Sequence, residues 1–329
     1  MEQNGDSTID EIVLSYQNKE RKIFSEFVNE LISRLEGSKQ NRLAEAYLVT
    51  SRSLKSFNKG KEVSLQNIDI ALVENYESYL KKKGLSLNTI SFYLRNIRSV
   101  YNKAIKEGVI DRTHTNPFSE VFTGVAKTRK RAVRQDVITQ LLRLDIKEAA
   151  FFQPVTDVES LKKSVSFARD LFVLSFYLRG ISFVDLAYLK KTNLTKDFIT
   201  YVRCKTGQRI EIALTARIRT ILKRYAPFCA HSEFLLPILD CSGDRLAYLS
   251  ALKRQNRHLK KLSTMIGLNT ELTTYVSRHS WASIALSKGY PVSIISQGLG
   301  HESEKTTQIY LDTFDYSVLH KANNDITCL

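Results

Sequence analysis

Apolar residues recur at every third or fourth position through most of the chain, which is the spacing of one buried helix face. Between residue 10 and about Gly108 this pattern predicts four helices, the last beginning near Ser86, and helices are expected again from Asp136 onward. The apolar stripe of the helix after Ser86 consists of Leu87, Ile90, Leu94, Ile97, Tyr101 and Ala104. The chain is therefore predicted to be mainly helical.

One segment follows a different period. Residues 198–214 alternate apolar and polar side chains and are interrupted by Thr206-Gly207, a pair typical of turns. Alternation with a period of two indicates a half-buried strand, so the segment is predicted to form a β-hairpin. The expected fold class is mainly α with a small β-hairpin, that is, α+β.

A break in the helical pattern divides the chain. Asn116-Pro117 and Gly124 are followed by a basic run with five positive side chains in eight residues, Lys127, Arg129, Lys130, Arg131 and Arg134. We predict a helical domain over 1–122, a basic linker over 123–135 and a second domain over 136–329 that ends in a tail. Such a linker could neutralise the phosphates of a DNA backbone, although a merely solvated hinge would have the same composition.

Length and composition exclude several classes of protein. With 329 residues, 43% hydrophobic and 25% charged, the chain can bury a full core and is expected to form two domains. It has no run of about 18 uncharged apolar residues, and its first residues lack the order of a signal peptide. We therefore expect a soluble, cytoplasmic protein with no membrane partner. Neither a zinc site nor a disulfide framework is expected from the cysteines Cys204, Cys229, Cys241 and Cys328.

The charge balance indicates a polyanionic partner. The net charge is +15, and residues 127–329 hold 31 basic against 18 acidic side chains, whereas residues 1–126 hold 18 against 16. This favours nucleic acid, although a basic pI is common among intracellular proteins. On the helix after Ser86, the polar face includes Asn88, Ser91 and Arg95. These donors could contact DNA phosphates or base edges, or could simply face solvent.

Common catalytic motifs are missing from the sequence. Gly60-Lys61 is followed by Glu62 and lacks the upstream glycine of a phosphate-binding loop, and there is no G-x-G-x-x-G, H-E-x-x-H or G-x-S-x-G. Acidic residues are scattered, with no cluster that recommends a two-metal nuclease. We therefore expect neither a cofactor nor a metal.

Two stretches near the end of the chain carry the informative motifs. The first reads Tyr275-Val-Ser-Arg278-His279-Ser-Trp281-Ala. The second reads Gly298-Leu-Gly300-His301-Glu-Ser-Glu-Lys-Thr306-Thr307-Gln-Ile-Tyr310. These resemble the R-H-[ST]-x-A and L-G-H-x-x-x-x-T-T-x-x-Y boxes of the tyrosine recombinases, the phage integrase family. Lys205-Thr-Gly207 in the predicted hairpin resembles the lysine turn of that family.

The resemblance covers both domains, with residues 20–110 similar to the helical core-binding domain and residues 135–315 similar to the catalytic domain. It implies that Tyr310 attacks a DNA phosphate and leaves a 3′-phosphotyrosyl link, with Lys205 as the general acid for the 5′-hydroxyl. Arg278 and a second arginine would clamp the non-bridging oxygens, and His301 would be a third donor. The chemistry is sound, because a phosphoryl transition state gains negative charge that planar guanidinium groups can stabilise.

The chain departs from the family pattern at two positions. Tyr275 stands where many members have a histidine three residues before the arginine, and its phenol could still donate a hydrogen bond to a phosphate oxygen. In Tyr177-Leu-Arg179-Gly-Ile-Ser182-Phe-Val-Asp185-Leu, alignment of Asp185 with the family's glutamate puts Ser182 at the first arginine. Arg179, which we expect one helical turn upstream, is predicted to fill that role.

The resemblance further implies a two-domain clamp around double-stranded DNA, acting at specific sites as a homotetramer through a Holliday junction. Accessory DNA-bending proteins and a nucleoid location would fit such an enzyme. The predicted activity is site-specific recombination by a DNA invertase. The alternatives are an integrase or excisionase of a mobile element, and a catalytically impaired DNA-binding regulator with the same fold. The tail 312–329 is predicted either to dock on a neighbouring protomer or to fray in solvent.

Overall fold

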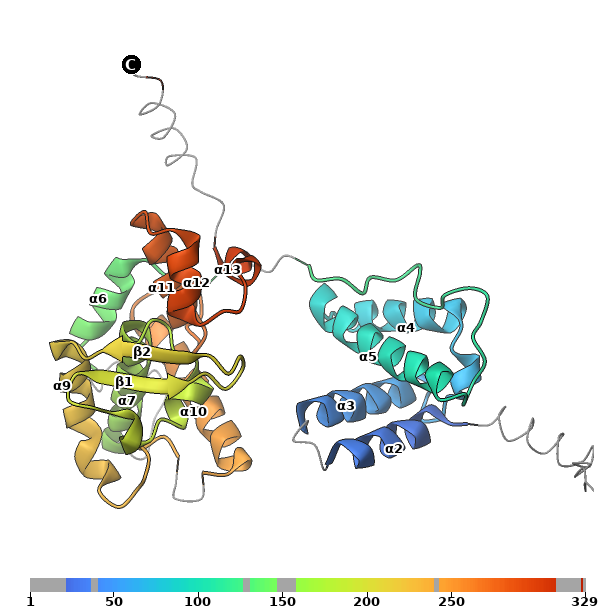
Figure 1. Ribbon diagram of the computed structural model, residues 1–329, viewed down its shortest axis with the longest axis horizontal. Coiled ribbons are helices and arrows are strands. Elements are labelled where there is room, and N and C mark those ends of the chain that lie inside the picture. The colour runs from blue at the N-terminus through green and yellow to red at the C-terminus, as the bar shows by residue number, and fades with distance from the viewer. Residues whose placement is uncertain are drawn as a thin grey trace, which may run out of the picture. The chain divides into compact units, whose positions relative to one another are not determined.

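A computed structural model of the chain describes residues 22–36, 41–126, 131–146, 158–239, 243–311 and 327. The chain packs as two units, 1–128 and 129–329, and each is considered by itself. Within the described ranges the secondary structure is mostly helical, with one two-stranded antiparallel sheet (Figure 1). This confirms the predicted fold class. No helix in these ranges is both long enough and apolar enough to cross a membrane.

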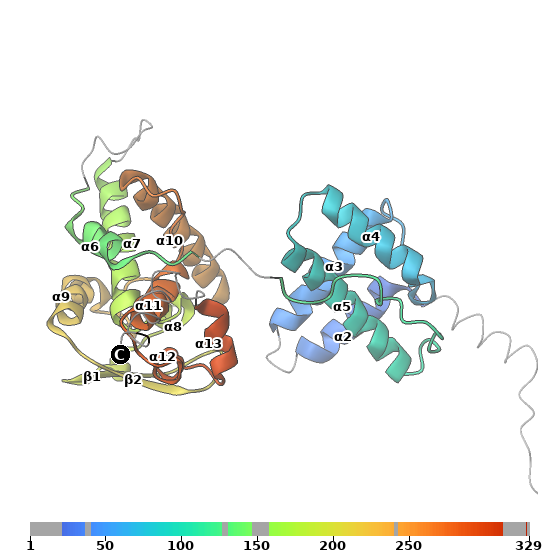
Figure 2. The same ribbon diagram turned by 90° about the horizontal axis from the view of Figure 1, so that it is seen from above.

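The first unit is built from helices alone. They are α2 (Phe24–Glu36), α3 (Asn41–Phe57), the 3-10 turn η1 (Leu65–Asn67), α4 (Ile70–Lys82) and α5 (Leu87–Lys106). The α3 helix packs against α2 and α5, and α4 packs against α5 (Figure 2). Ser86 caps α5, because its Oγ accepts a hydrogen bond from the backbone N–H of Thr89 at 3.4 Å. The predicted stripe is buried from Ile90 to Ala104, whereas Leu87 is exposed.

Part of the polar face of α5 is covered by the chain itself. Ser91 is fully buried and donates a hydrogen bond to the carbonyl of Gly124 at 2.6 Å. The Asn88 side chain exchanges two hydrogen bonds with the backbone of Ala126, at 2.9 and 2.8 Å. The prediction that Ser91 is open to DNA is therefore wrong, because Ser91 is buried. The structure gives no support for DNA contact by Asn88, because its side chain is already hydrogen-bonded to the backbone of Ala126. Residues 123–126, assigned to the linker from the sequence, pack on the first unit.

The second unit contains the sheet and the remaining helices. The helices are α6 (Gln135–Arg143), α7 (Val158–Tyr177), α8 (Phe183–Ala187), α9 (Ala216–Tyr225), α10 (Arg245–Met265), α11 (Val276–Ser287), α12 (Val292–Leu299) and α13 (Glu304–Tyr310). Short 3-10 turns occur at η3 (Lys191–Asn193) and η4 (Ala226–Cys229). The α7 helix is central, because α6, α9, α10 and α11 all pack against it.

The predicted hairpin is present. Strand β1 (Phe198–Val202) pairs antiparallel with β2 (Arg209–Ala213). Ile199, Tyr201, Ile210 and Ile212 are buried, and the alternating side chains are more exposed. One face of the two strands therefore belongs to the core, as the period of two requires.

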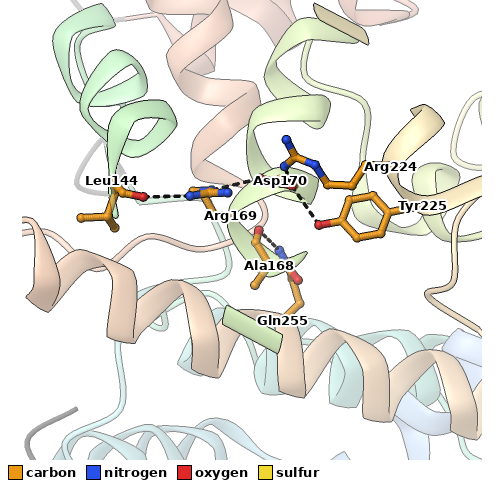
Figure 3. Close-up of polar contacts among 7 residues, drawn as sticks. All are labelled: Leu144, Ala168, Arg169, Asp170, Arg224, Tyr225 and Gln255. Atoms are coloured by element: carbon orange, nitrogen blue, oxygen red, sulfur yellow. Dashed lines mark hydrogen bonds and ion pairs between the residues drawn. The ribbon is translucent and has the colours of Figure 1, made fainter. Parts of the chain in front are cut away.

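A buried carboxylate joins α7 to α9. Asp170 forms ion pairs with Arg169 at 3.0 Å and with Arg224, and it accepts a hydrogen bond from the Tyr225 hydroxyl at 2.8 Å (Figure 3). Two residues earlier on α7, the Ala168 carbonyl accepts from Gln255 of α10 at 2.8 Å. Polar contacts thus reinforce the apolar packing around α7.

A small apolar cluster holds the last three helices together. Ala282 of α11, Ile295 and Leu299 of α12, and Leu311 after α13 are buried in it. At Gly298 an added Cβ would lie 2.8 Å from Cη2 of Trp281, so a larger residue there would require the Trp281 ring to shift. The cluster sets the position of α13, which ends at Tyr310.

We expect Asp170→Asn to destabilise the second unit. The substitution leaves Arg169 and Arg224 without their carboxylate, and removing one member of a buried ion pair costs about 3 kcal/mol. Urea unfolding should show the loss. Asp197→Asn, which removes an exposed pair with Arg219 at 3.5 Å, is the matched control and should change stability by less than about 1 kcal/mol. Equal effects of the two substitutions would contradict the role given to Asp170.

His258 makes the stability of this unit depend on pH. It is buried on α10, and its pKa is lowered to about 4 by burial and then by the positive charges of Arg257, Lys261 and Arg254. Between pH 6.5 and 4 the unfolded chain binds a proton that the folded chain does not, so stability falls as the pH falls. His258→Gln should reduce this slope by about 1.4 kcal/mol per pH unit in that window. Urea titrations at several pH values would measure it, and an unchanged slope would refute it.

Candidate active site

A buried guanidinium is at the centre of the site. Arg278, in the first turn of α11, is only 2% exposed. Its Nη1 donates to the carbonyl of Gly180 at 2.8 Å, and its Nη2 donates to the carbonyl of Leu299 at 2.5 Å. The same Nη2 lies 3.0 Å from Nε2 of His301. Arg278 therefore joins α11 to the loop after α7 and to the end of α12.

Gly180 allows this close approach. Its φ is +69°, in the left-handed region, and a Cβ there would lie 2.6 Å from Cα of Arg278. No side chain could fit between these two backbones, so glycine is required for both its conformation and its size. Its carbonyl can then reach the guanidinium.

His301 is held as a neutral imidazole. It is 6% exposed, and its pKa is lowered to about 3 by burial and then by Arg278, Arg203 and Lys205. Because Arg278 can only donate, Nε2 must be the acceptor, and Nδ1–H then donates to Oγ1 of Thr307 at 2.8 Å. The predicted role as a third phosphate donor does not match this arrangement, in which Nε2 bears a lone pair.

The contact between His301 and Thr307 places α13 beside the guanidinium. Thr307 is fully buried, and α13 packs against α11 and α12. Tyr310 is the last residue of α13, one helical turn after Thr307. The Tyr310 side chain lies outside the described part of the structure.

The hairpin turn brings Lys205 to the same region. Lys205 is exposed, and the amide of the preceding Cys204 donates to Oδ1 of Asp185 at 2.8 Å. On the other side of the turn, Gln208 donates to the carbonyl of His301 at 3.2 Å. Two motifs almost 100 residues apart in sequence therefore meet, as the proposed chemistry requires.

Arg179 lies in the loop between α7 and α8 rather than on a helix. The α7 helix ends at Tyr177, and Arg179 is half-buried with a φ of +55°. The prediction that Arg179 lies one helical turn from Ser182 is therefore wrong. Its backbone adjoins Gly180, whose carbonyl binds Arg278.

Ser182 has a structural role. Its Oγ donates to Oδ2 of Asp185 at 2.6 Å and accepts from the Asp185 amide at 3.4 Å, which caps α8.

The charges of Arg179, Arg203 and Arg278 all act on the buried hydroxyl of Tyr201. Burial nevertheless raises the pKa of that phenol. Arg179 is therefore the arginine near the first motif that shares the electrostatic environment of Arg278.

Tyr275 lies at the start of α11 and is 43% exposed. Its ring contacts the ring of His279 edge to face, with the centroids 4.9 Å apart. A supporting role for Tyr275 stays a prediction.

The predicted DNA-binding residues are distributed over several places. Arg95 is exposed on α5, and Arg131 and Arg134 are exposed before α6, where Arg134 forms an ion pair with Asp136 at 2.6 Å. Lys127, Arg129 and Lys130 lie outside the described residues, as does the tail 312–329 apart from residue 327. These positions stay predictions.

A basic surface on α10 was missed from the sequence. The helix contains no Asp or Glu, and its exposed basic side chains are Arg245, Lys253, Arg254, Arg257 and Lys260. Four of these, from Lys253 to Lys260, follow helical spacing and share one face. The net charge of residues 127–329 was the available signal, but it does not show which helix carries the charge.

The described ranges contain no group of three or more His, Cys, Asp or Glu side chains that could hold a metal ion. The side chains of Lys205, Arg278 and His301 are cationic or neutral, and the nearby Asp185 carboxylate already accepts from the Cys204 amide and the Ser182 hydroxyl. Such a set suits an anion.

Comparisons with known proteins agree with this organisation. Residues 23–123 match the phage integrase SAM-like domain, and residues 158–316 match the phage integrase family. Tyrosine recombinase XerA of Pyrococcus horikoshii is 28% identical over 275 residues, covering 73% of this chain and 88% of that protein.

Solved structures share the fold. The Tn1549 transposon integrase in complex with transposon right end DNA has a TM-score of 0.63 and 13% identity, covering 93% of this chain and 100% of that chain. A lambda integrase tetramer bound to a Holliday junction has a TM-score of 0.61 and 16% identity, covering 91% and 80%. Because the two family models together match most of the chain, this protein is a member of the phage integrase family, the tyrosine recombinases.

Proposed function

We propose that this protein is a site-specific DNA recombinase that breaks and rejoins duplex DNA through a covalent link to Tyr310. The observation that carries the proposal is the convergence of Arg278, His301 and the Lys205 turn beside the helix that ends at Tyr310. These groups come from four separate elements. The packing of an apolar core does not require these polar groups to converge.

The proposed step is an in-line displacement at phosphorus. The Tyr310 phenol releases its proton to water as its oxygen attacks phosphorus, the bond to the 5′-oxygen breaks, and Lys205 transfers a proton to that oxygen. Arg278 and Arg179 stabilise the negative charge on the non-bridging oxygens. The bond energy is kept in the 3′-phosphotyrosyl link, so rejoining requires neither a nucleotide nor a metal. Neutral His301 holds Arg278 in place through Nε2.

Several basic surfaces support double-stranded DNA as the partner. We propose that the exposed face of α10 contacts phosphates. Arg95 and the basic run from Lys127 to Arg134 would contact phosphates as well. The two units would close on the duplex as a clamp. The fold shared with lambda integrase makes a tetramer on a Holliday junction the assembly that we propose.

Among the kinds of site-specific recombination, we propose DNA inversion, with integration or excision of a mobile element as the alternative. Recombination assays with inverted and direct copies of one site distinguish the two outcomes. A DNA-binding regulator without cleavage activity is a second candidate. It is favoured by Ser182, which stands at the first arginine position with its hydroxyl already bonded to Asp185.

We expect the wild-type protein to form a covalent adduct with a nicked suicide duplex that carries its site. The adduct should survive SDS and form in EDTA, because the proposed step uses no metal. Tyr310→Phe should bind the same duplex and form no adduct, since it lacks the attacking oxygen. Gel electrophoresis of both proteins measures this. Specific binding without an adduct in either protein would support the regulator instead.

A second prediction separates Arg179 from Ser182. Arg179→Ala should slow single-turnover cleavage by roughly 10²-fold or more, because half of the phosphate clamp is lost. Ser182→Ala should leave cleavage within about threefold of wild type and should cost about 1 kcal/mol of stability as a lost helix cap. The reverse order of cleavage rates would remove Arg179 from the clamp.

A further inference from the structure

The hairpin turn is tied to the chain around Gly300 by three of its side chains. Arg203 donates from Nη1 to the carbonyl of Gly300, and Thr206 donates to the same carbonyl at 3.2 Å. Gln208 donates to the next carbonyl, that of His301, at 3.2 Å. The turn that contains Lys205 is therefore hydrogen-bonded directly to the segment that contains His301.

Arg203 is buried in this contact. It is 4% exposed, and its Nε has no hydrogen-bond partner within the described part of the chain. Burying a guanidinium with incomplete pairing costs several kcal/mol of folding free energy. An apolar residue at a strand end would serve the core at lower cost. The position therefore has a use other than stability.

The end of α12 explains why a cation suits this place. The last carbonyls of a helix have no partner within the helix and carry its partial negative charge. Gly300 is the cap of α12 with a φ of +65°, and a Cβ there would lie 2.7 Å from Cδ1 of Ile210 and 3.3 Å from Cδ of Arg203. Arg278 takes the Leu299 carbonyl and Arg203 takes the Gly300 carbonyl. Two arginines thus cap one helix end.

Lys205 stands between anchored neighbours. The Arg203 carbonyl accepts the amides of Thr206 and Gly207, at 3.3 and 2.8 Å, which closes the turn. The Cys204 amide is fixed to Asp185. The Lys205 side chain is exposed, and its backbone lies between the contact of Cys204 with Asp185 and the contacts of Arg203 and Thr206 with Gly300.

We propose that Arg203 is a positioning residue for strand cleavage. Its buried guanidinium holds the Lys205 turn against the Gly300–His301 backbone, which fixes the distance between the general acid and the Arg278–His301 pair. Thr206 and Gln208 assist it. This rests on the proposed function, because it presumes that Lys205 protonates the leaving 5′-oxygen.

A substrate with sulfur in place of the scissile 5′-oxygen tests the proposal. A thiolate leaves without protonation, so this substrate makes a general acid unnecessary. Arg203→Met should slow cleavage of the oxygen substrate by roughly 10²-fold, because the acid is misplaced. It should cleave the sulfur substrate within about threefold of the wild-type rate. Single-turnover adduct formation measures both.

Two variants control the experiment. Lys205→Met should show the same rescue by sulfur, since it removes the acid itself. Arg219→Met removes an exposed arginine of the same unit that pairs with Asp197, and it should leave both rates within about threefold of wild type. If Arg203→Met slows both substrates equally, the proposed positioning role is wrong. If Lys205→Met is not rescued, Lys205 is not the acid and the proposal fails with it.

Hydrogen exchange separates the anchor from the chemistry. In Arg203→Met, amides of residues 203–208 and 299–303 should both exchange at least about tenfold faster, because they lose a shared contact. Unchanged exchange at either segment would overturn the anchor, whatever the cleavage rates. If Arg203→Met exchanges faster at both segments but the wild-type protein forms no adduct, the anchor exists and the proposed function is wrong.

Discussion

A guanidinium taken out of water must be surrounded by acceptors, and this constraint organises the second unit. The two terminal nitrogens of Arg278 meet it with the carbonyls of Gly180 and Leu299 and with the neutral ring of His301. Each acceptor imposes a condition: glycine at 180, a helix that ends at 299, and an imidazole without a proton on Nε2. These contacts therefore hold the loop after α7, the start of α11 and the end of α12 together.

Under the proposed function, the same constraint would prepare the site for an anion. Backbone carbonyls hold Arg278 and Arg203, so positive charge would be fixed before a phosphate binds. Preorganised charge of this kind needs no rearrangement during reaction, which is how electrostatic catalysis acts most effectively. The low pKa of His301 follows from the same surroundings, because burial and three nearby cations oppose its protonation. A second guanidinium on Gly300 extends the arrangement to the hairpin turn.

Stability and function overlap only in part in this unit. The carboxylate of Asp170 joins α7 to α9, whereas the apolar core around α7 extends to Ile210, which lies against Gly300. The site itself contains buried cations with few acidic partners, which is unfavourable for folding. The large core on α7 therefore stabilises the scaffold that keeps these cations together.

By itself, the sequence determined the helices, the hairpin, the two-part organisation and the motifs around Lys205, Arg278 and His301. All of these are local patterns, because helical and strand periods and the order of residues in a motif depend only on near neighbours. The tertiary structure decided which polar residues are buried: Ser91 against residues 123–126, where it donates to the Gly124 carbonyl, and Arg203 against the end of α12, where it donates to the Gly300 carbonyl. It also decided that Arg179 lies in a left-handed turn and that His301 accepts from Arg278. These outcomes depend on contacts between residues far apart in the chain, which no local pattern contains.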